Sequence, residues 1–334
     1  MKALVYIGVE KLIFREEHKP QEILGESIIK VKASGICGSD MHAFHGKDER
    51  RSPPLILGHE ICGVTQNGKF KNQAVVLNPL ITCDKCFYCK NKREHLCPQR
   101  IMVGMSKPIQ REGGLAEFVS IPDKNIYIIP SDLSPNEAAL TEPTAVAVHA
   151  VELAINNLTK PITDCRILIQ GAGAIGLLCG LILEKDKKCK DIILSDPNKL
   201  RLDECSKYLN AKFFNPSSKD LNENGFDIIF DTVGLEVSRQ QAIHIIAPGG
   251  VIIHVGLTQP SGNFNFKKLT IQEITVVGTY CYTKKDFEIS INFLDKKKLG
   301  KLDWIEYREL KDGAEAFKEI HSGKCVAPKI ILLP

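Results

Sequence analysis

The chain has 334 residues, which exceeds the usual size of a single hydrophobic core, so two domains are expected. A hydrophobic fraction of 43% and a charged fraction of 25% are ordinary for a soluble globular protein. The formal net charge of +4 comes from interspersed basic and acidic residues, which argues against a nucleic-acid-binding surface. No apolar run is long enough to cross a bilayer, so we expect neither nucleic acid nor membrane as a partner.

The N-terminal segment, residues 1–20, has neither a signal-peptide core nor the composition of a transit peptide. Without a secretion signal, clustered thiols more often bind metal or do chemistry than form disulfides. The chain contains 12 cysteines, so a reducing compartment is expected. The predicted location is the cytoplasm.

Two stretches near the N-terminus carry metal-binding side chains: ASGICGSDMHAFHG (33–46) and LGHEICG (57–63). Cys37 offers a thiolate, His59 an imidazole and Glu60 a carboxylate. Such a mixed set leaves one coordination position for water or substrate, as a catalytic zinc requires. Taken singly, each residue also fits a structural role, as a core thiol, a satisfied core histidine or a surface charge.

The stretch LITCDKCFYCKNKREHLCPQ (80–99) contains four closely spaced cysteines: Cys83, Cys86, Cys89 and Cys97. Thiolates with two residues between them in a tight turn can bind the same ion, and four thiolates complete the tetrahedral shell of zinc. The set needs no further ligand, so we predict a closed, structural zinc site. Scattered buried thiols or a disulfide pair are the alternatives.

From residue 164 the pattern changes to strand, glycine turn, helix and strand. The buried strand run RILIQ is followed by Gly171, Gly173 and Gly176. The first glycine allows the tight turn, the second lets the backbone approach a pyrophosphate, and the third lets the helix pack closely on the strand. Ala174 and Ile175 open the helix, whose N-terminal amides face the phosphates. The turn predicts a dinucleotide site.

Asp196 ends the second strand, 20 residues after Gly176. A carboxylate there accepts hydrogen bonds from both ribose hydroxyls and repels a 2′-phosphate, so NAD is the expected cofactor. Arg201 lies near enough to accommodate that phosphate, but as long as Asp196 is present its negative charge would still disfavour the phosphate, so NAD remains the expected cofactor. Asp196 followed by proline also fits a turn that begins a helix.

Apolar runs at 226–234, 249–257 and 274–283 are bounded by turn signals and continue the alternation of strand and helix. This alternation predicts a doubly wound parallel sheet, so the fold class is α/β plus a β-rich part. We expect a catalytic domain over 1–140 with the zinc lobe at 80–99, a cofactor domain over 141–283, and a C-terminal return to the catalytic domain over 284–334 in which Gly323 ends a helix.

The chain contains these motifs in the order C-G-S-D-x-x-H, G-H-E, four cysteines and a glycine turn. In this order it resembles the zinc-dependent medium-chain alcohol and polyol dehydrogenases over essentially its whole length. TEPTAV (141–146) places Glu142 where typical alcohol dehydrogenases have a cysteine ligand, as in the sorbitol and galactitol-1-phosphate dehydrogenase types. The resemblance implies a GroES-like catalytic domain beside a Rossmann cofactor domain. The segment after G-H-E, residues 66–79, departs from the family by being short and lacking an acidic residue.

The resemblance also implies roles for individual residues. Two zinc ions are expected, and Cys37, His59 and Glu60 adjoin the catalytic one; Glu142 is either a further ligand or holds the zinc-bound water. Ser39 would take the proton of the substrate hydroxyl, and His42 would pass it to solvent through the cofactor ribose. Val255 and Gly256 would lie near the nicotinamide. Asp40 would accept a hydrogen bond from His59, or it merely caps a helix.

The predicted function is hydride transfer between NAD and a secondary hydroxyl of a polyol or sugar alcohol, phosphorylated or not. A small secondary alcohol, a diol or threonine is the alternative substrate, and a zinc-stabilised binding protein is the alternative without catalysis. Arg50 and Arg51 either meet a phosphate or hydroxyl-rich substrate or form a solvated charge run, and we favour the run. The family implies a homodimer or homotetramer joined near the last cofactor-domain strands.

Overall fold

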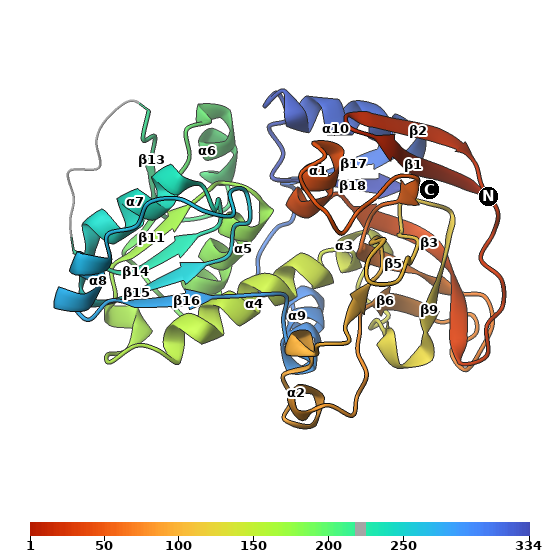
Figure 1. Cartoon of the computed structure of the whole chain (residues 1–334), viewed down its shortest axis with the longest axis horizontal. Coiled ribbons are helices and arrows are strands. Elements are labelled where there is room, and N and C mark those ends of the chain that lie inside the picture. The colour runs from red at the N-terminus through yellow and green to blue at the C-terminus, as the bar shows by residue number, and fades with distance from the viewer. Residues whose placement is uncertain (218–224) are drawn as a thin grey trace.

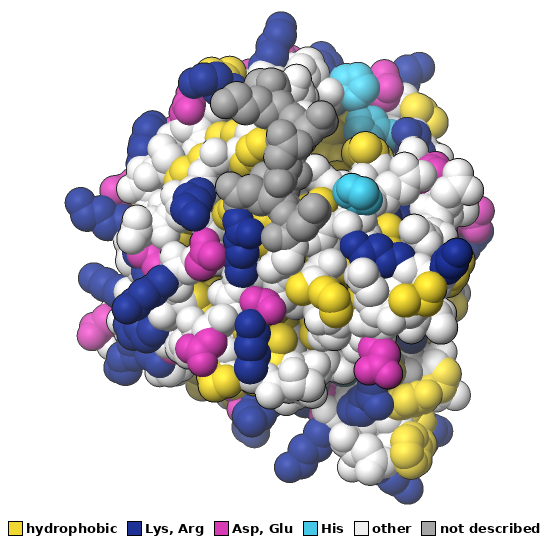
Figure 2. Space-filling view, turned by 90° about the vertical axis from the view of Figure 1, so that its left-hand side faces the viewer, with side chains coloured by type: hydrophobic (Ala, Val, Ile, Leu, Met, Phe, Trp, Pro, Cys, Tyr) yellow, Lys and Arg dark blue, Asp and Glu magenta, His cyan; other side chains and the backbone are white. Residues whose placement is uncertain are grey.

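The computed structural model describes residues 1–217 and 225–334. Two sheet-containing parts lie side by side, and both termini belong to the part with residues 1–130 (Figure 1). Within the described ranges, no helix combines the length and apolar character needed to span a membrane. On the face turned to the viewer in Figure 2, basic and acidic side chains are interspersed over the surface.

One part is built on a six-stranded sheet in the order β13-β12-β11-β14-β15-β16, with every neighbouring pair parallel. Its strands are β11 (Ile167–Gln170), β12 (Ile192–Ser195), β13 (Lys212–Phe214), β14 (Phe226–Asp231), β15 (Ile246–His254) and β16 (Thr275–Gly278). The order reverses between β11 and β14, the switch point at which such sheets bind ligands. The predicted doubly wound sheet is confirmed, although β16 is shorter than the predicted 274–283.

Helices cover both faces of this sheet (Figure 1). They are α4 (Thr141–Ile155), α5 (Ala174–Leu181), α6 (Lys199–Cys205), α7 (Glu236–Ile245) and α8 (Phe266–Ile271). Successive strand residues point to opposite faces, so Ile167 and Ile169 join the core that contains α4 and α5, whereas Leu168 joins the core under α7. Burial on both faces explains why the strand sequences are continuously apolar.

The other part is β-rich. Its main sheet runs β10-β6-β5-β3-β18-β17, with β9 also paired to β3, and a small sheet runs β2-β1-β4. The strands are β1 (Lys2–Gly8), β2 (Lys11–Glu16), β3 (Glu26–Gly35), β4 (Leu55–Ile56), β5 (Glu60–Thr65), β6 (Ala74–Leu77), β9 (Phe118–Pro122), β10 (Ile126–Ile128), β17 (Ile305–Glu309) and β18 (Lys329–Leu333). Because β18 pairs with β3, the end of the chain completes the sheet that begins it.

Four helices of the described residues accompany this part: α1 (Gly38–Phe44), α3 (Pro135–Ala138), α9 (Lys284–Asp295) and α10 (Gly313–His321). The helix α10 ends before Gly323, which has a φ of +69°, as predicted for a helix stop. Between the two parts, α9 packs against α4, so the helix after the parallel sheet returns the chain to the β-rich part.

The four-cysteine segment projects from the β-rich part around the short helix α2 (Phe87–Lys90) (Figure 1). The Sγ atom of Cys97 lies 3.5 Å from that of Cys83, and Cys86 and Cys89 are also separated by 3.5 Å. Zinc–sulfur bonds of about 2.3 Å in a tetrahedron place neighbouring sulfurs about 3.8 Å apart. All four sulfurs lie within 4.8 Å of one another, so the described geometry fits a zinc ion.

Replacing Cys97 with serine should lower the zinc content from about two ions to about one per chain, because three thiolates no longer close the tetrahedron. Unfolding should require at least about 2 kcal/mol less free energy. Zinc analysis and thermal denaturation measure both effects. Cys179→Ala is the matched control, since Cys179 is equally buried but lies in α5, and it should keep both ions. An unchanged zinc content in Cys97→Ser would contradict the structural site.

Candidate active site

Cys37, His59 and Glu60 converge where β3 ends and β5 begins. One donor atom from each, a sulfur, a nitrogen and an oxygen, lies within 4.8 Å of the others. Glu60 is paired with Gly35 across the β3–β5 ladder. A Cβ atom on Gly35 would lie 1.8 Å from Glu60 Oε2, so only glycine leaves room for the carboxylate there.

This donor set fits zinc. Zinc bonds to sulfur, nitrogen and oxygen of about 2.0–2.3 Å require ligand atoms roughly 3.3–3.8 Å apart, which small side-chain shifts from the described positions supply. The buried Asp40 carboxylate lies behind two of these residues, Cys37 and His59. Its Oδ2 accepts the Cys37 backbone N–H at 3.0 Å, and its Oδ1 lies 3.6 Å from His59 Nδ1. Asp40 therefore caps α1, and it lies beside His59 without the expected hydrogen bond, because neither Asp40 Oδ1 nor His59 Nδ1 has a hydrogen-bond partner among the described residues.

Glu60 has a second partner that the sequence did not indicate. Lys329, on β18, places its Nζ 2.6 and 2.8 Å from the two carboxylate oxygens and also donates to the Ile36 carbonyl at 2.9 Å. Burial disfavours the charged lysine, but the Glu60 carboxylate and the nearby Cys37 and Glu142 charges together outweigh this effect and raise the pKa of Lys329 above its usual value. The pair keeps Glu60 in place beside the other donors.

Glu142, in the first turn of α4, is buried next to this group but is not one of the three converging donors. Burial raises its pKa to about 7; the neighbouring His59 opposes this and Glu60 adds to it. The Tyr282 hydroxyl also lies close enough to lower the pKa of Glu142, although the described residues offer it no hydrogen-bond partner at normal distance. Tyr282 follows β16, so the carboxyl edge of the parallel sheet borders the metal-competent group.

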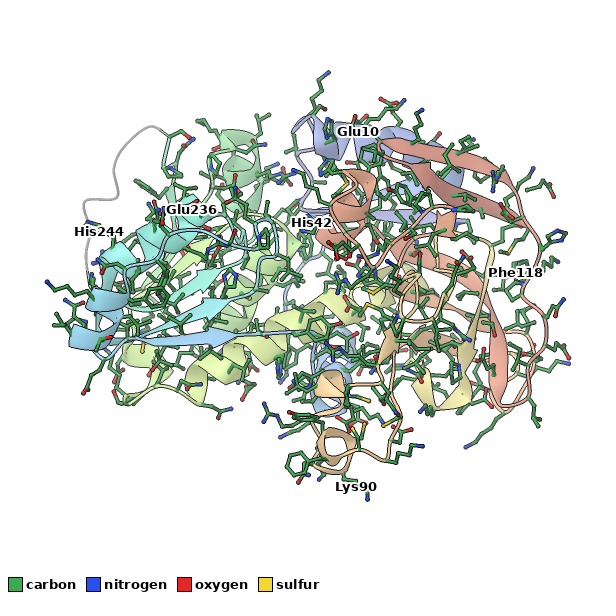
Figure 3. All side chains as sticks on the ribbon, in the orientation of Figure 1. Glu10, His42, Lys90, Phe118, Glu236 and His244 are labelled. Atoms are coloured by element: carbon green, nitrogen blue, oxygen red, sulfur yellow. The ribbon has the colours of Figure 1, made fainter. Side chains whose placement is uncertain are left out.

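Ser39 and His42 lie three residues apart on α1, a spacing that places them on one face of the helix. Figure 3 shows His42 on the side of α1 that faces the parallel-sheet part. The Ser39 Oγ accepts a hydrogen bond from Arg51 Nη2 at 3.1 Å. The Arg51 residue is only 3% exposed, so the expectation of a solvated charge run is wrong for Arg51; its hydrogen bonds to the α1 segment account for the burial.

The glycine turn has the geometry that a dinucleotide needs. Gly171 has a φ of +103°, and a Cβ on Gly176 would lie 1.8 Å from the Gly171 carbonyl oxygen. At Gly173, by contrast, the part of the chain that the structure describes places no atom within 4 Å of the Cβ position, which leaves space for a phosphate. Ala174 and Ile175 are the first two residues of α5. The residues present therefore fit a pyrophosphate at this helix N-terminus.

Asp196 lies beside this turn, because its Oδ2 accepts the Ala172 backbone N–H at 2.8 Å and its Oδ1 accepts that of Asn198 at 2.7 Å. Each oxygen keeps a lone pair that a ribose hydroxyl can use. Arg201 is directed elsewhere: its Nε donates to the Cys325 carbonyl of the C-terminal segment at 3.4 Å.

Val255 and Gly256 follow β15, and both backbone N–H groups donate to the Asp231 carbonyl. The Asp231 side chain, fully buried, accepts from His254 Nδ1 at 3.0 Å and from the Gly234 N–H at 2.8 Å. Asp231 was not among the residues predicted for the site, although an aspartate as the last residue of a buried strand was the available signal. A cavity of about 450 Å³ beside residues 15–26 and 110–112 is lined by none of the predicted site residues.

Comparison with known proteins agrees with this geometry. Residues 24–131 match the alcohol dehydrogenase GroES-like domain, and residues 174–296 match the zinc-binding dehydrogenase domain. A probable D-xylulose reductase A of Emericella nidulans is 30% identical over 96% of this chain and 94% of its own length. The L-galactonate-5-dehydrogenase of Escherichia coli is 30% identical over 86% of this chain and 85% of its own.

The fold matches solved structures over its full length. An alcohol dehydrogenase from Thermus sp. ATN1 superposes with a TM-score of 0.91 at 22% identity, covering 100% of both chains. The GroES-like domain, the Rossmann sheet and the two metal-competent groups occur here in one chain. The chain belongs to the zinc-dependent medium-chain alcohol and polyol dehydrogenases and is an oxidoreductase of that family.

Proposed function

We propose that the chain transfers a hydride between NAD and a secondary hydroxyl of a polyol or sugar alcohol. One observation carries the proposal. The Cys37, His59 and Glu60 donors lie next to residues that follow the carboxyl edge of the parallel sheet, and the same sheet carries the dinucleotide turn. A metal-held hydroxyl and a nicotinamide can meet only if both sites border the same space. The relatives named for xylulose and galactonate support a substrate rich in hydroxyl groups.

A bound zinc ion would lower the pKa of the substrate hydroxyl, and NAD would accept the hydride. Cys37, His59 and Glu60 would hold the metal, and Glu142 would be a fourth ligand or would hold a water molecule at the metal. The Ser39 hydroxyl would receive the substrate proton while releasing its own, and His42 would pass the proton to solvent. Gly171 to Gly176 and Asp196 would hold the cofactor, and Val255 and Gly256 would border its nicotinamide.

We further propose the division into residues 1–140, 141–283 and 284–334 and a homodimer or homotetramer. β16 ends the described parallel sheet, and its free edge can pair with another strand. Val276 on β16 and Ile271 before it are 43% and 70% exposed, which supports an interface at this edge.

All 12 cysteines are free, which supports a reducing compartment such as the cytoplasm.

Asp196→Ser should shift cofactor preference toward NADP. The variant loses the carboxylate that binds the ribose hydroxyls and repels a 2′-phosphate, so the ratio of kcat/KM for NAD to that for NADP should fall at least about tenfold. Steady-state rates with both cofactors measure it. Arg201→Gln is the companion variant and should leave the wild-type ratio within about twofold. An unchanged ratio in Asp196→Ser would exclude the ribose contact.

His42→Gln should lower kcat about 100-fold at neutral pH, because it removes the group that accepts the proton. In the native chain, burial lowers the pKa of His42 below 6.5; Asp48 opposes this, and His45, Arg51 and Arg50 add to it. The neutral acceptor therefore persists below pH 6.5, and the native rate should fall only at still lower pH.

The pH dependence of kcat for oxidation measures this relay. His45→Gln is the matched control, because His45 ends the same helical segment but contacts His321, with the two rings 2.8 Å apart at their nearest nitrogens. It should retain the native kcat at neutral pH, and the fall of the rate should begin at slightly higher pH, because His45 no longer lowers the pKa of His42. A His42→Gln variant with native kcat and profile would remove His42 from the proposed relay.

NADH formation by the zinc-loaded chain should be fastest on sorbitol, xylitol or galactitol 1-phosphate among a panel that also contains threonine, butanediol and ethanol. A polyol offers several hydroxyls to the polar groups around Glu142, whereas ethanol offers one. Cys37→Ser should abolish turnover and still bind NAD, which calorimetry measures. If threonine, butanediol or ethanol is oxidised fastest, the polyol assignment is wrong; silence on every alcohol with both zinc ions and NAD bound would overturn the proposed function.

A further inference from the structure

Arg51 is a buried cation at the base of α1, with no exposed side-chain surface. A guanidinium is costly to bury unless its donors are all used. Here Nε donates to the Gly104 carbonyl at 3.1 Å, and Nη1 donates to the Ser39 carbonyl at 3.3 Å and to Asp48. These bonds hold the guanidinium in one orientation.

The third nitrogen of the guanidinium, Nη2, reaches the proposed proton relay. Nη2 donates to Ser39 Oγ at 3.1 Å, so one lone pair of that hydroxyl is occupied. A serine hydroxyl has one proton and two lone pairs and otherwise rotates to suit its neighbours. With one lone pair used, Ser39 keeps one lone pair to accept a proton and one proton to release.

Arg51 also lies against the support of the metal-competent histidine. Its guanidinium is 3.8 Å from Asp40 Oδ1, the oxygen that lies 3.6 Å from His59 Nδ1. One fixed cation therefore touches the relay serine on one side and the carboxylate behind His59 on the other.

We propose that Arg51 is a positioning residue that fixes the Ser39 hydroxyl for proton transfer. This role rests on the proposed function. As the substrate O–H bond breaks and a new Oγ–H bond forms, the original Oγ–H bond must break and release its proton toward His42 or water. A positive guanidinium opposes a second proton remaining on Oγ, so it favours release in the same step.

A purely structural role predicts something different. If Arg51 only ties residues 48–51 to Gly104 and α1, its loss lowers stability and affects turnover equally whether or not Ser39 is present. If it acts through Ser39, its loss matters only when the serine hydroxyl is there. A double-mutant cycle separates the two roles.

The experiment compares Arg51→Gln, Ser39→Ala and the double variant in the zinc-loaded chain with NAD and the best alcohol of the panel. Arg51→Gln should lower kcat about 10- to 100-fold and change the KM of the alcohol less than about threefold, the size expected for a hydrogen bond from a charged donor. In the Ser39→Ala background the same change should lower kcat less than about threefold. Equal losses in both backgrounds would overturn the proposal.

Arg50→Gln is the matched control. Arg50 is the neighbouring arginine, forms a two-bond pair with Asp48 and makes no bond to Ser39 within the described structure. It should keep kcat within about twofold. A loss in Arg50→Gln as large as in Arg51→Gln would assign the effect to the loop and overturn the proposal.

Crystal structures give a readout that does not depend on turnover. The Ser39 side chain should leave its present rotamer in Arg51→Gln and keep it in Arg50→Gln, and an unmoved hydroxyl in both would overturn the positioning role. If Arg51→Gln does not fold, Arg51→Lys replaces it in the double-mutant cycle. Arg51→Lys should lower kcat by a smaller factor, and this loss of kcat should again disappear in the Ser39→Ala background. Absence of turnover in the native chain would refute the proposed function, whereas the rotamer tests Arg51 by itself.

Discussion

The buried pair between Glu60 and Lys329 is the contact on which the rest of the site depends. It joins β5 to β18 across 269 residues of sequence, with both side chains nearly inaccessible to solvent. Removing one member of such a pair leaves an uncompensated buried charge, which costs more than the intact pair contributes. The last strand of the chain therefore completes the sheet and also supplies the cation that keeps a metal-competent carboxylate in place.

Charge balance extends this constraint to the neighbouring residues. Asp40, Glu60 and Glu142 are all buried near one another, and unpaired carboxylates in such a place become neutral rather than remain charged. Lys329 faces Glu60 and Arg51 faces Asp40, whereas Glu142 forms no ion pair with a residue that the structure describes, and burial raises its pKa to about 7. Glu142 is thus the carboxyl that most needs a metal ion nearby to stay ionised, which suits it to a role beside zinc.

Local patterns were predictable because each feature and its partner lie within a few residues. The glycine turn, the buried strands and the four-cysteine segment needed no distant contact, and the parallel sheet followed from the alternation of strands and helices. Lys329 and Tyr282 were not predictable, since nothing beside them in the sequence shows that they reach Glu60 and Glu142. Arg51 was misjudged for the same reason: next to Arg50 it reads as a surface charge, and only the fold buries it against Ser39.

The C-terminal segment also links the two binding regions. Asn198, whose backbone N–H is held by Asp196, donates its side-chain amide to the Gly323 carbonyl, and Arg201 donates to that of Cys325. Four residues after Cys325, Lys329 holds Glu60. A cofactor ribose at Asp196 would therefore rest on a loop that is hydrogen-bonded to the segment leading into β18. Residues 323–329 therefore contact the surroundings of the proposed ribose site at one end, through Asn198 and Arg201, and hold Glu60 at the other, through Lys329.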